Sequence, residues 1–371
     1  MALPRSKYVQ EGHEGVYHCF SRCVRRAFLC GFDAATGRDF SHRKKWLVDR
    51  LRYLAAVFAI EVCAYSIMEN HYHTILRLRP DIVASWSDWE VATRWLILFP
   101  PRRSLKRLSR PLEEDIRALA QCPERIAILR RRLCSLSWFM GRLNEFIARA
   151  ANKEDGVKGR FWESRFKCQA LLDYAAIAAC MVYVDLNPVR AGLAPTPEDS
   201  NFTSIQQRIR AWSEQFPTSA PAPSAAEQHR LPGSIPDAIP MSQNTGESFE
   251  QQSPMPALAS SWLCPISSAP HPRPILQMTE PDYFDLVDTS GRMMRSDKRG
   301  AISPNLAPIL LRIGANPDAW LDTISRFGNK FRLAAGLLPN LRLFADRLGR
   351  RWIKGVTAAR TAFVARPPQP A

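Results

Sequence analysis

Two apolar runs separated by a short polar stretch are the clearest pattern in the chain. Residues 61–68 and 71–78 are rich in β-branched, aromatic and other apolar side chains, and the polar residues Glu69 and Asn70 lie between them. This arrangement predicts two strands joined by a tight turn. Residues 15–22 have a similar composition and predict an earlier strand.

Helical periodicity appears in two further regions. After Ser41, a good N-cap residue, the apolar side chains recur every three or four positions and predict a helix over 41–59. Its predicted buried face consists of Leu47, Leu51, Leu54 and Phe58. A broad apolar face predicts one long helix over 123–152, whereas the mixed segment 80–121 predicts helical pieces and an exposed loop.

The next predicted elements are a strand and an apolar helix. Aromatic and charged residues alternate over 161–167, which predicts a strand. Asp173 is then in position to cap a helix over 174–186, and the dipeptide of Asn187 and Pro188 ends it.

The composition changes after about Trp212. Residues 216–281 are rich in Pro, Ser, Ala and Gln, and they carry too little apolar surface to offset the entropy of ordering, which predicts a disordered linker. Its one apolar island, 262–266, is a candidate for docking elsewhere on the protein. Short helices are predicted again at 306–313, 317–327 and 341–353. The predicted domains are therefore 1–212, a linker over 213–281, and a small basic helical region over 282–371.

Charge narrows the range of partners. The 371 residues carry a net charge of +16, with a pI near 9.8, which favours nucleic acid or an acidic membrane surface. No apolar run reaches the ~18 residues of a membrane-spanning helix, and the N-terminus does not resemble a secretory signal. Nine dispersed cysteines without a Cys-x-x-Cys pair are typical of reduced intracellular thiols. We therefore expect a cytoplasmic, nucleoid-associated protein with a nucleic-acid partner and no membrane partner.

The first candidate site lies on the second strand of the predicted hairpin. His71 and His73 are two residues apart, so they project from one face of that strand while Tyr72 points to the other. Two adjacent imidazoles form half of a divalent-metal site. The alternative is a pair of partly exposed strand histidines. His18 is a weaker candidate, because a lone histidine on a strand is more often a packed core residue.

The second candidate site lies at the end of the apolar helix. Tyr183 and Asn187 are four residues apart and share a face if the last turn stays helical. A tyrosine can act as the nucleophile in phosphoryl transfer when a divalent metal neutralises the phosphate, and an amide oxygen can be a third metal ligand. Alternatively, Tyr183 is a half-buried helix aromatic and Asn187 belongs to a helix-terminal turn.

Basic side chains near aromatic rings form a candidate DNA-binding surface. Cations that follow the phosphates, together with rings that stack on bases, suit single-stranded nucleic acid. The candidate residues are Arg22, Arg25, Arg160, Arg165, Lys167 and Arg190. The alternative is an amphipathic strand with a solvated charged face.

Four segments together resemble the motifs of the single-tyrosine HUH transposases, in the branch of the REP-associated tyrosine transposases. They occur in the family's order, and the resemblance extends from about Pro4 to Ser204. The segments are Tyr17–Arg22, Ser66–His73, Gly159–Lys167 and Tyr183–Leu193.

The resemblance implies a fold, a cofactor and a reaction. The implied fold is an α+β, ferredoxin-like antiparallel sheet covered by helices. His71, His73 and, less firmly, Asn187 would hold Mg²⁺ or Mn²⁺. Tyr183 would attack single-stranded DNA with hairpin or palindromic ends, leaving a 5′-phosphotyrosyl link that is rejoined without ATP. The resemblance leaves open whether the protein acts as a monomer or a homodimer.

Two departures from the family pattern and two alternative functions accompany the resemblance. Glu69 stands where the family usually has proline, and the segment 80–121 is longer than expected. One alternative is a domesticated relative that binds hairpin DNA without cutting it. The other is a metal phosphodiesterase that uses bound water, which would not need Tyr183.

Overall fold

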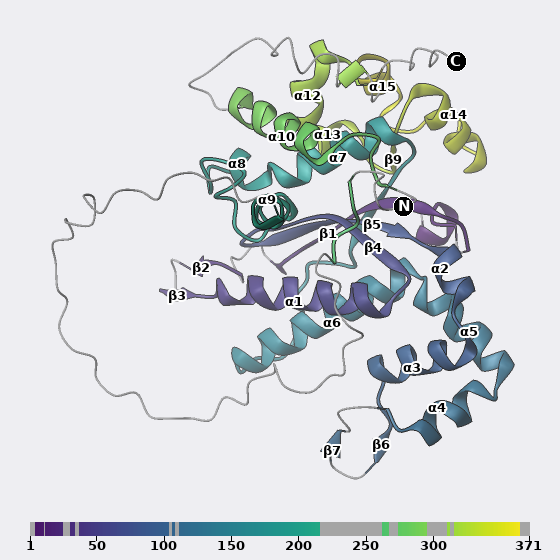
Figure 1. The fold of residues 1–371 in the computed structure, drawn as a ribbon. Coiled ribbons are helices and arrows are strands. Elements are labelled where there is room, and N and C mark those ends of the chain that lie inside the picture. The colour runs from purple at the N-terminus through teal and green to yellow at the C-terminus, as the bar shows by residue number, and fades with distance from the viewer. Residues whose placement is uncertain are drawn as a thin grey trace, which may run out of the picture.

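A five-stranded sheet forms the centre of the protein (Figure 1). In this computed structural model, the described residues are 4–10, 12–24, 30–33, 37–103, 106–107, 111–215, 262–266, 274–294, 310–311 and 315–363. The sheet order is β4-β5-β1-β8-β9, with β9 parallel to β8 and the other neighbours antiparallel. The strands are β1 (Gly15–Arg22), β4 (Ile60–Ile67), β5 (His71–Leu78), β8 (Lys167–Leu171) and β9 (Ala334–Ala335).

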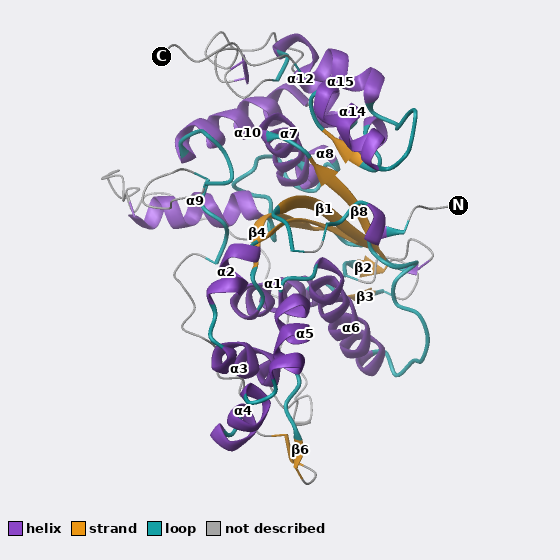
Figure 2. Ribbon diagram, turned by 90° about the vertical axis from the view of Figure 1, so that its right-hand side faces the viewer, coloured by secondary structure: helices purple, strands orange, loops and turns teal. Residues whose placement is uncertain are grey.

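Helices cover both faces of this sheet, as Figures 1 and 2 show. One face packs against α1 (His42–Val57) and α6 (Leu136–Glu154), and the other packs against α7 (Tyr174–Asp185). On that second side lie α9 (Ser204–Gln215) and α10 (Glu280–Met294). The predicted α+β class, with an antiparallel sheet covered by helices, is confirmed.

The predicted strand, helix, strand, strand order is also confirmed. Leu47, Leu51 and Leu54 are fully buried along α1, and Phe58 is buried just after it. Ser41 does precede α1, but its side chain makes no capping hydrogen bond. Its backbone amide instead donates to the carboxylate of Asp39.

The segment 80–121 forms part of a helical group that projects away from the sheet (Figure 2). The predicted helical pieces are present as α2 (Pro80–Ser85), α3 (Asp88–Leu98) and α4 (Glu113–Ala120). In place of the loop that we predicted, β6 (Arg102–Arg103) and β7 (Lys106–Arg107) pair as a small antiparallel hairpin at the far end of the group.

The single long helix predicted over 123–152 is wrong. The structure contains α5 (Pro123–Leu133) and then α6, and the backbone of Ser135 between them is extended. The break allows the two helices to pack against different partners, because α5 contacts α3 and α4 whereas α6 contacts α1. The apolar pattern over 123–152 is continuous, so it could not predict that the two halves pack against different helices.

The strand predicted over 161–167 is also wrong, because the strand of this region, β8, only begins at Lys167. Phe161 and Phe166 are both buried although they are five positions apart, which strict alternation does not allow. The indole of Trp162 donates to the backbone carbonyl of Asn144 in the middle of α6, so the segment packs against that helix.

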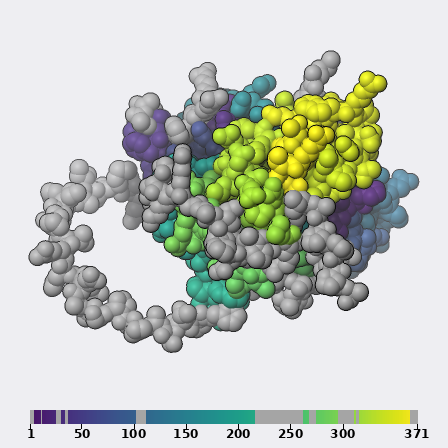
Figure 3. All heavy atoms as spheres, turned by 90° about the horizontal axis from the view of Figure 1, so that it is seen from above, coloured from purple at the N-terminus to yellow at the C-terminus, as the bar shows by residue number. Residues whose placement is uncertain are grey.

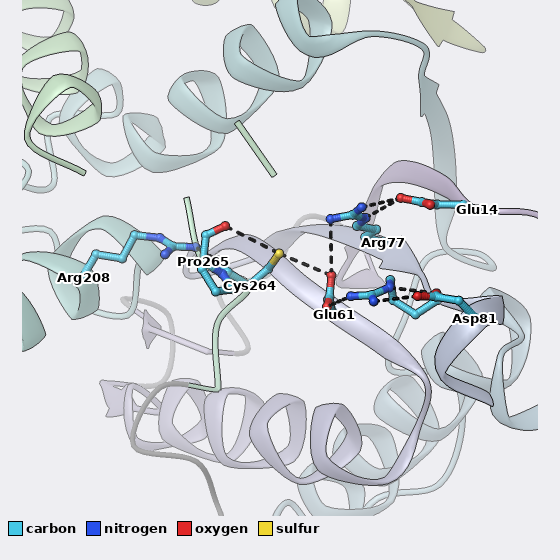
Figure 4. A network of polar contacts seen from close by, with 8 residues as sticks. Glu14, Glu61, Arg77, Asp81, Arg208, Cys264 and Pro265 are labelled. Atoms are coloured by element: carbon cyan, nitrogen blue, oxygen red, sulfur yellow. Dashed lines mark hydrogen bonds and ion pairs between the residues drawn. The ribbon is translucent and has the colours of Figure 1, made fainter. Parts of the chain in front are cut away.

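The predicted linker lies largely outside the described residues, but its apolar island does not. Residues 262–266 run beside β4, where Leu263 pairs with Val62. Figure 4 shows the polar contacts that hold this segment. Arg208 of α9 donates to the carbonyls of Cys63 and Cys264 at 2.9 and 2.7 Å, and the Cys264 thiol donates to Glu61 at 3.3 Å.

The C-terminal helices follow the predicted positions in part. The helix predicted at 306–313 lies almost entirely outside the described residues. The one predicted at 317–327 is a short 3-10 turn, η3 (Pro317–Ala319), followed by α12 (Trp320–Ser325). The one predicted at 341–353 is instead α14 (Leu338–Arg347), and it ends where Gly349 adopts a φ of +64°.

The remaining short elements complete the fold. They are η1 (Arg5–Lys7), β2 (Phe32–Asp33), β3 (Arg38–Asp39), α8 (Asn187–Arg190), α13 (Phe327–Lys330) and α15 (Val356–Ala362). Among the described helices, none combines the length and the apolar character needed to cross a membrane.

Candidate active site

The two histidines of β5 lie on the face of the sheet that α7 covers. Tyr72, on the opposite face, donates its hydroxyl to Asn144 of α6. Strand pairing places Arg22 opposite His71 and Phe20 opposite His73. The predicted shared face of His71 and His73 is therefore confirmed.

His18 of β1 is part of the same site. Its Nε2 lies 2.8 Å from Nδ1 of His73, and its Nδ1 lies 3.4 Å from the amide oxygen of Gln169 on β8. An amide oxygen only accepts, so Nδ1 of His18 carries the proton and Nε2 accepts from His73. This orientation leaves Nε2 of His73 with a free lone pair.

His71 is oriented in the same sense by its neighbour in the chain. Its Nδ1 lies 2.6 Å from the side-chain oxygen of Asn70, so that nitrogen is the donor and Nε2 keeps its lone pair. Burial, together with the nearby guanidinium groups of Arg22 and Arg190, lowers the pKa of His71 to about 4. Burial also holds the pKa of His73 well below its usual value. Both imidazoles are therefore neutral near pH 7 and can act as ligands.

Tyr183 lies above these histidines on the inner side of α7. The ring centroids of Tyr183 and His73 are 5.7 Å apart, and those of Tyr183 and His18 are 6.0 Å apart, both in edge-to-face geometry. The predicted cap positions the helix, since Asp173 accepts a hydrogen bond from the backbone amide of Ala176 at 3.0 Å. Residues more than 100 positions apart in the chain thus meet at one site.

Arg190 of α8 adds a positive charge beside the tyrosine. Its guanidinium carbon is 4.4 Å from the centroid of the Tyr183 ring. It also donates to the side-chain oxygen of Asn187 at 2.5 Å and to the carbonyl of Ser325 at 2.9 Å. Arg190 therefore connects the tyrosine helix to the C-terminal region.

The donor set fits a divalent cation in part. His71 and His73 offer two imidazole nitrogens, but Asn187 uses its oxygen for Arg190 and would have to release it to become a ligand. The buried Nδ2 of Asn187 has no hydrogen-bond partner in the described part of the chain. Within the same residues, no group of three or more His, Cys, Asp or Glu side chains is arranged for metal binding. Glu69 packs against Gly31.

Three of the candidate DNA-binding residues, Arg22, Lys167 and Arg190, lie near this site. Lys167 is exposed, pairs across the sheet with Phe20 and lies 5.6 Å from the centroid of its ring. Arg22 and Arg190 flank the histidines. Arg160 and Arg165 are exposed in the segment between α6 and β8, and Arg25 lies outside the described residues.

Residues of the C-terminal region pack against Tyr183, which the sequence did not predict. The Phe327 ring lies 5.8 Å from that of Tyr183. At Gly328, an added Cβ would lie 3.3 Å from the Tyr183 hydroxyl oxygen. Gln169 was also missed from the sequence, and His18 was only a weaker candidate there. Only strand pairing could have placed these two, because each is unremarkable within its own strand.

Comparisons with known proteins add a single likeness. No family model and no curated protein matches the chain. A solved structure described as "Structure of the REP associates tyrosine transposase bound to a REP hairpin" is similar over 63% of this chain and 100% of that chain, at 13% sequence identity and a TM-score of 0.31. At so low a TM-score the likeness lends no support to the fold or the site, and both depend on the residues described above.

Proposed function

We propose that this protein is a metal-dependent enzyme that cleaves and rejoins hairpin-containing single-stranded DNA through a 5′-phosphotyrosine at Tyr183. One observation carries the proposal: the Tyr183 ring lies 5.7 Å from that of His73, which presents a free Nε2 beside Arg190. A core aromatic would need neither the oriented imidazoles nor the adjacent guanidinium.

The reaction assigns a role to each group. The Tyr183 oxygen forms a bond to phosphorus and loses its proton, while the bond from phosphorus to the 3′-oxygen breaks and that oxygen becomes a hydroxyl. Arg190 is placed to pair with a phosphate oxygen, because its guanidinium lies against the tyrosine ring. His71 and His73 would hold Mg²⁺ or Mn²⁺, which supplies positive charge to the scissile phosphate when bound.

The charge of the protein supports a DNA substrate. The net charge is +16, and Arg160, Arg165 and Lys167 are exposed in the segment that leads into β8. Such cations attract the phosphate backbone. The proposed preference for DNA with hairpin or palindromic ends is based on the family resemblance.

A second candidate is a protein that binds the same DNA without cutting it. The bond between Arg190 and Asn187 favours this candidate, because it occupies the oxygen expected to be the third metal ligand. The two candidates differ in one product, the covalent adduct.

The deciding experiment measures that adduct. The protein is incubated with labelled, hairpin-rich single-stranded DNA in Mn²⁺ or EDTA, and adducts are resolved on a denaturing gel. We expect a Mn²⁺-dependent adduct that Tyr183→Phe abolishes, while DNA binding persists. Tyr174→Phe is the matched control, because Tyr174 is on the same helix but 43% exposed and away from the histidines.

Each other result has a defined meaning. DNA binding without an adduct would support the non-cutting candidate. Cleavage that survives Tyr183→Phe but is lost in His71→Ala would instead indicate attack by bound water. An adduct that is lost equally in Tyr174→Phe would argue against Tyr183 as the nucleophile.

A further inference from the structure

A strongly basic surface follows the end of α14. We call it the C-terminal patch and define it by Arg342, Arg347, Arg350, Arg351, Trp352 and Lys354, all of them exposed. Figure 3 shows that the C-terminal residues, in yellow, form part of the outer surface on this side of the molecule. The patch lies outside the part of the chain that resembles a known family.

Trp352 is the more exposed of the two tryptophans that reach the surface in the described part of the chain. It is 61% exposed, whereas its neighbour Ile353 and the nearby Phe344 are 2% exposed. These buried neighbours anchor the segment, so the outward position of Trp352 does not come from a loose chain. A fixed, exposed indole provides a flat surface on which a ring can stack.

The cations of the patch are largely free of partners. Within the part of the chain that the structure describes, Arg342, Arg350, Arg351 and Lys354 have no ion pair or hydrogen bond from their side chains. Arg347 donates to Gln10 at 3.2 Å. A solvated charged face of a helix usually carries both signs, whereas this surface is predominantly positive.

A second exposed tryptophan makes the contrast clear. Trp89 on α3 is 42% exposed, but the residues on either side of it are Asp88 and Glu90. Both carboxylates are in ion pairs, Asp88 with Arg130 and Glu90 with Arg94, so the charges beside Trp89 cancel. Exposure of an indole is therefore not enough to indicate a nucleic-acid-binding surface. The cations around Trp352, which are unpaired within the described residues, distinguish it from Trp89.

A chain of contacts through two phenylalanine rings connects the end of the patch with the candidate active site. At Gly355, just after the patch, an added Cβ would lie 2.7 Å from the Phe331 ring, so the two are in close contact. The Phe331 and Phe327 centroids are 5.2 Å apart, and Phe327 contacts Tyr183. The surface and the candidate nucleophile thus belong to one packed unit.

We propose that the C-terminal patch binds single-stranded DNA, with Trp352 stacking on an unpaired base and Arg350 and Arg351 pairing with phosphates. Stacking on an aromatic ring together with cations along the backbone is the usual means of binding single strands without sequence preference. The choice of DNA as the polyanion depends on the proposed function. The patch would hold a part of the substrate strand outside the site.

The test measures binding by the full-length protein in EDTA, so that cleavage does not interfere. The probe is a fluorescein-labelled oligothymidylate of about 20 nucleotides, followed by anisotropy. We expect Trp352→Leu to weaken binding about ten-fold, as the loss of one stacked base does. Trp89→Leu is the matched control and should leave the affinity unchanged.

The charge contribution is tested through its salt dependence. Removing a phosphate contact to a single strand lowers the slope of log affinity against log salt by about 0.7. We expect the Arg350→Gln, Arg351→Gln double variant to lower the slope by about twice that amount. Arg149→Gln with Arg292→Gln removes the same charge from exposed, ion-paired positions and should change the slope much less.

Three results would overturn the inference. The first is unchanged oligothymidylate affinity in both patch variants when circular dichroism shows them folded. The second is equal weakening in the matched controls. The third is a result in which the patch variants keep their affinity for oligothymidylate but no longer bind phosphatidylglycerol vesicles that the unmodified protein binds. That result would identify the patch as a lipid-binding surface. The tyrosine adduct assay is independent, so an adduct-forming protein with an inert patch would refute only this inference.

Discussion

At the scale of single residues, the orientation of His73 depends on a chain of three side chains. Gln169 orients His18, and His18 accepts from Nδ1 of His73 at 2.8 Å. Partners of this kind fix which nitrogen of a ligand histidine is free. His18 is 2% exposed and burial lowers its pKa to about 4, so it acts here as a neutral acceptor.

We predict that His18→Leu strongly reduces the adduct yield of the folded protein. The substitution leaves the buried Nδ1–H of His73 without an acceptor, which lowers the free energy of unfolding by about 1–3 kcal/mol. Urea denaturation measures the stability and the denaturing gel measures the adduct. His18→Gln can supply an acceptor oxygen and should recover part of the yield; a fully active His18→Leu would contradict this role.

At the scale of elements, α7 is held between the sheet and the C-terminal helices. Asp185 at its end accepts hydrogen bonds from Ser204 of α9 and from Tyr283 of α10. Burial raises the pKa of Asp185 to about 6, although these donors lower it. At the other side, α13 packs over Tyr183, and the absence of a side chain at Gly328 leaves room for the phenol oxygen.

We predict that Gly328→Val slows adduct formation by at least about ten-fold, because a branched side chain would displace the Tyr183 oxygen that a simple Cβ already approaches to 3.3 Å. The time course of the adduct measures this effect. Gly141→Ala on α6 is the control, since nothing lies within 4 Å of its Cβ, and it should be active. Wild-type rates in Gly328→Val would show that α13 moves away before reaction.

At the scale of the whole molecule, the C-terminal region shares the sheet and the core with the rest of the protein. β9 extends the sheet beside β8, and Asp173 both caps α7 and accepts from Leu337 and Asn340 at 2.6 and 2.9 Å. Phe327 is fully buried in the same core cluster. The division into one domain over 1–212 and a separate region over 282–371 remains a prediction. Because the two parts share these contacts, their unfolding behaviour can test it.

We predict a single cooperative unfolding transition for residues 1–212 and the C-terminal helices, because they share a sheet and one core. Differential scanning calorimetry measures this, with Asp173→Ala as the probe variant. Asp173→Ala should shift the whole transition to lower temperature, as it removes bonds to both parts. Two resolved transitions, with only one of them shifted, would instead indicate independent domains.

The elements that have a strong local pattern could be predicted from the amino-acid sequence. The hairpin that carries His71 and His73, the helix after Ser41 and the cap at Asp173 were all predictable, because alternation, periodicity and capping depend on nearby residues. The same reasoning placed Tyr183 on a helix. It failed over 123–152 and 161–167, where packing partners, not local pattern, decide where an element breaks.

The completion of the site depends on contacts between segments that are distant in the sequence. His18, Gln169 and Phe327 reach the histidines and the tyrosine through strand pairing and helix packing between segments far apart in the chain. The bond from Arg190 to Asn187 likewise depends on the turn of α8. Such contacts follow from the register of strands and the crossing of helices, which residue types and their spacing along the chain do not specify.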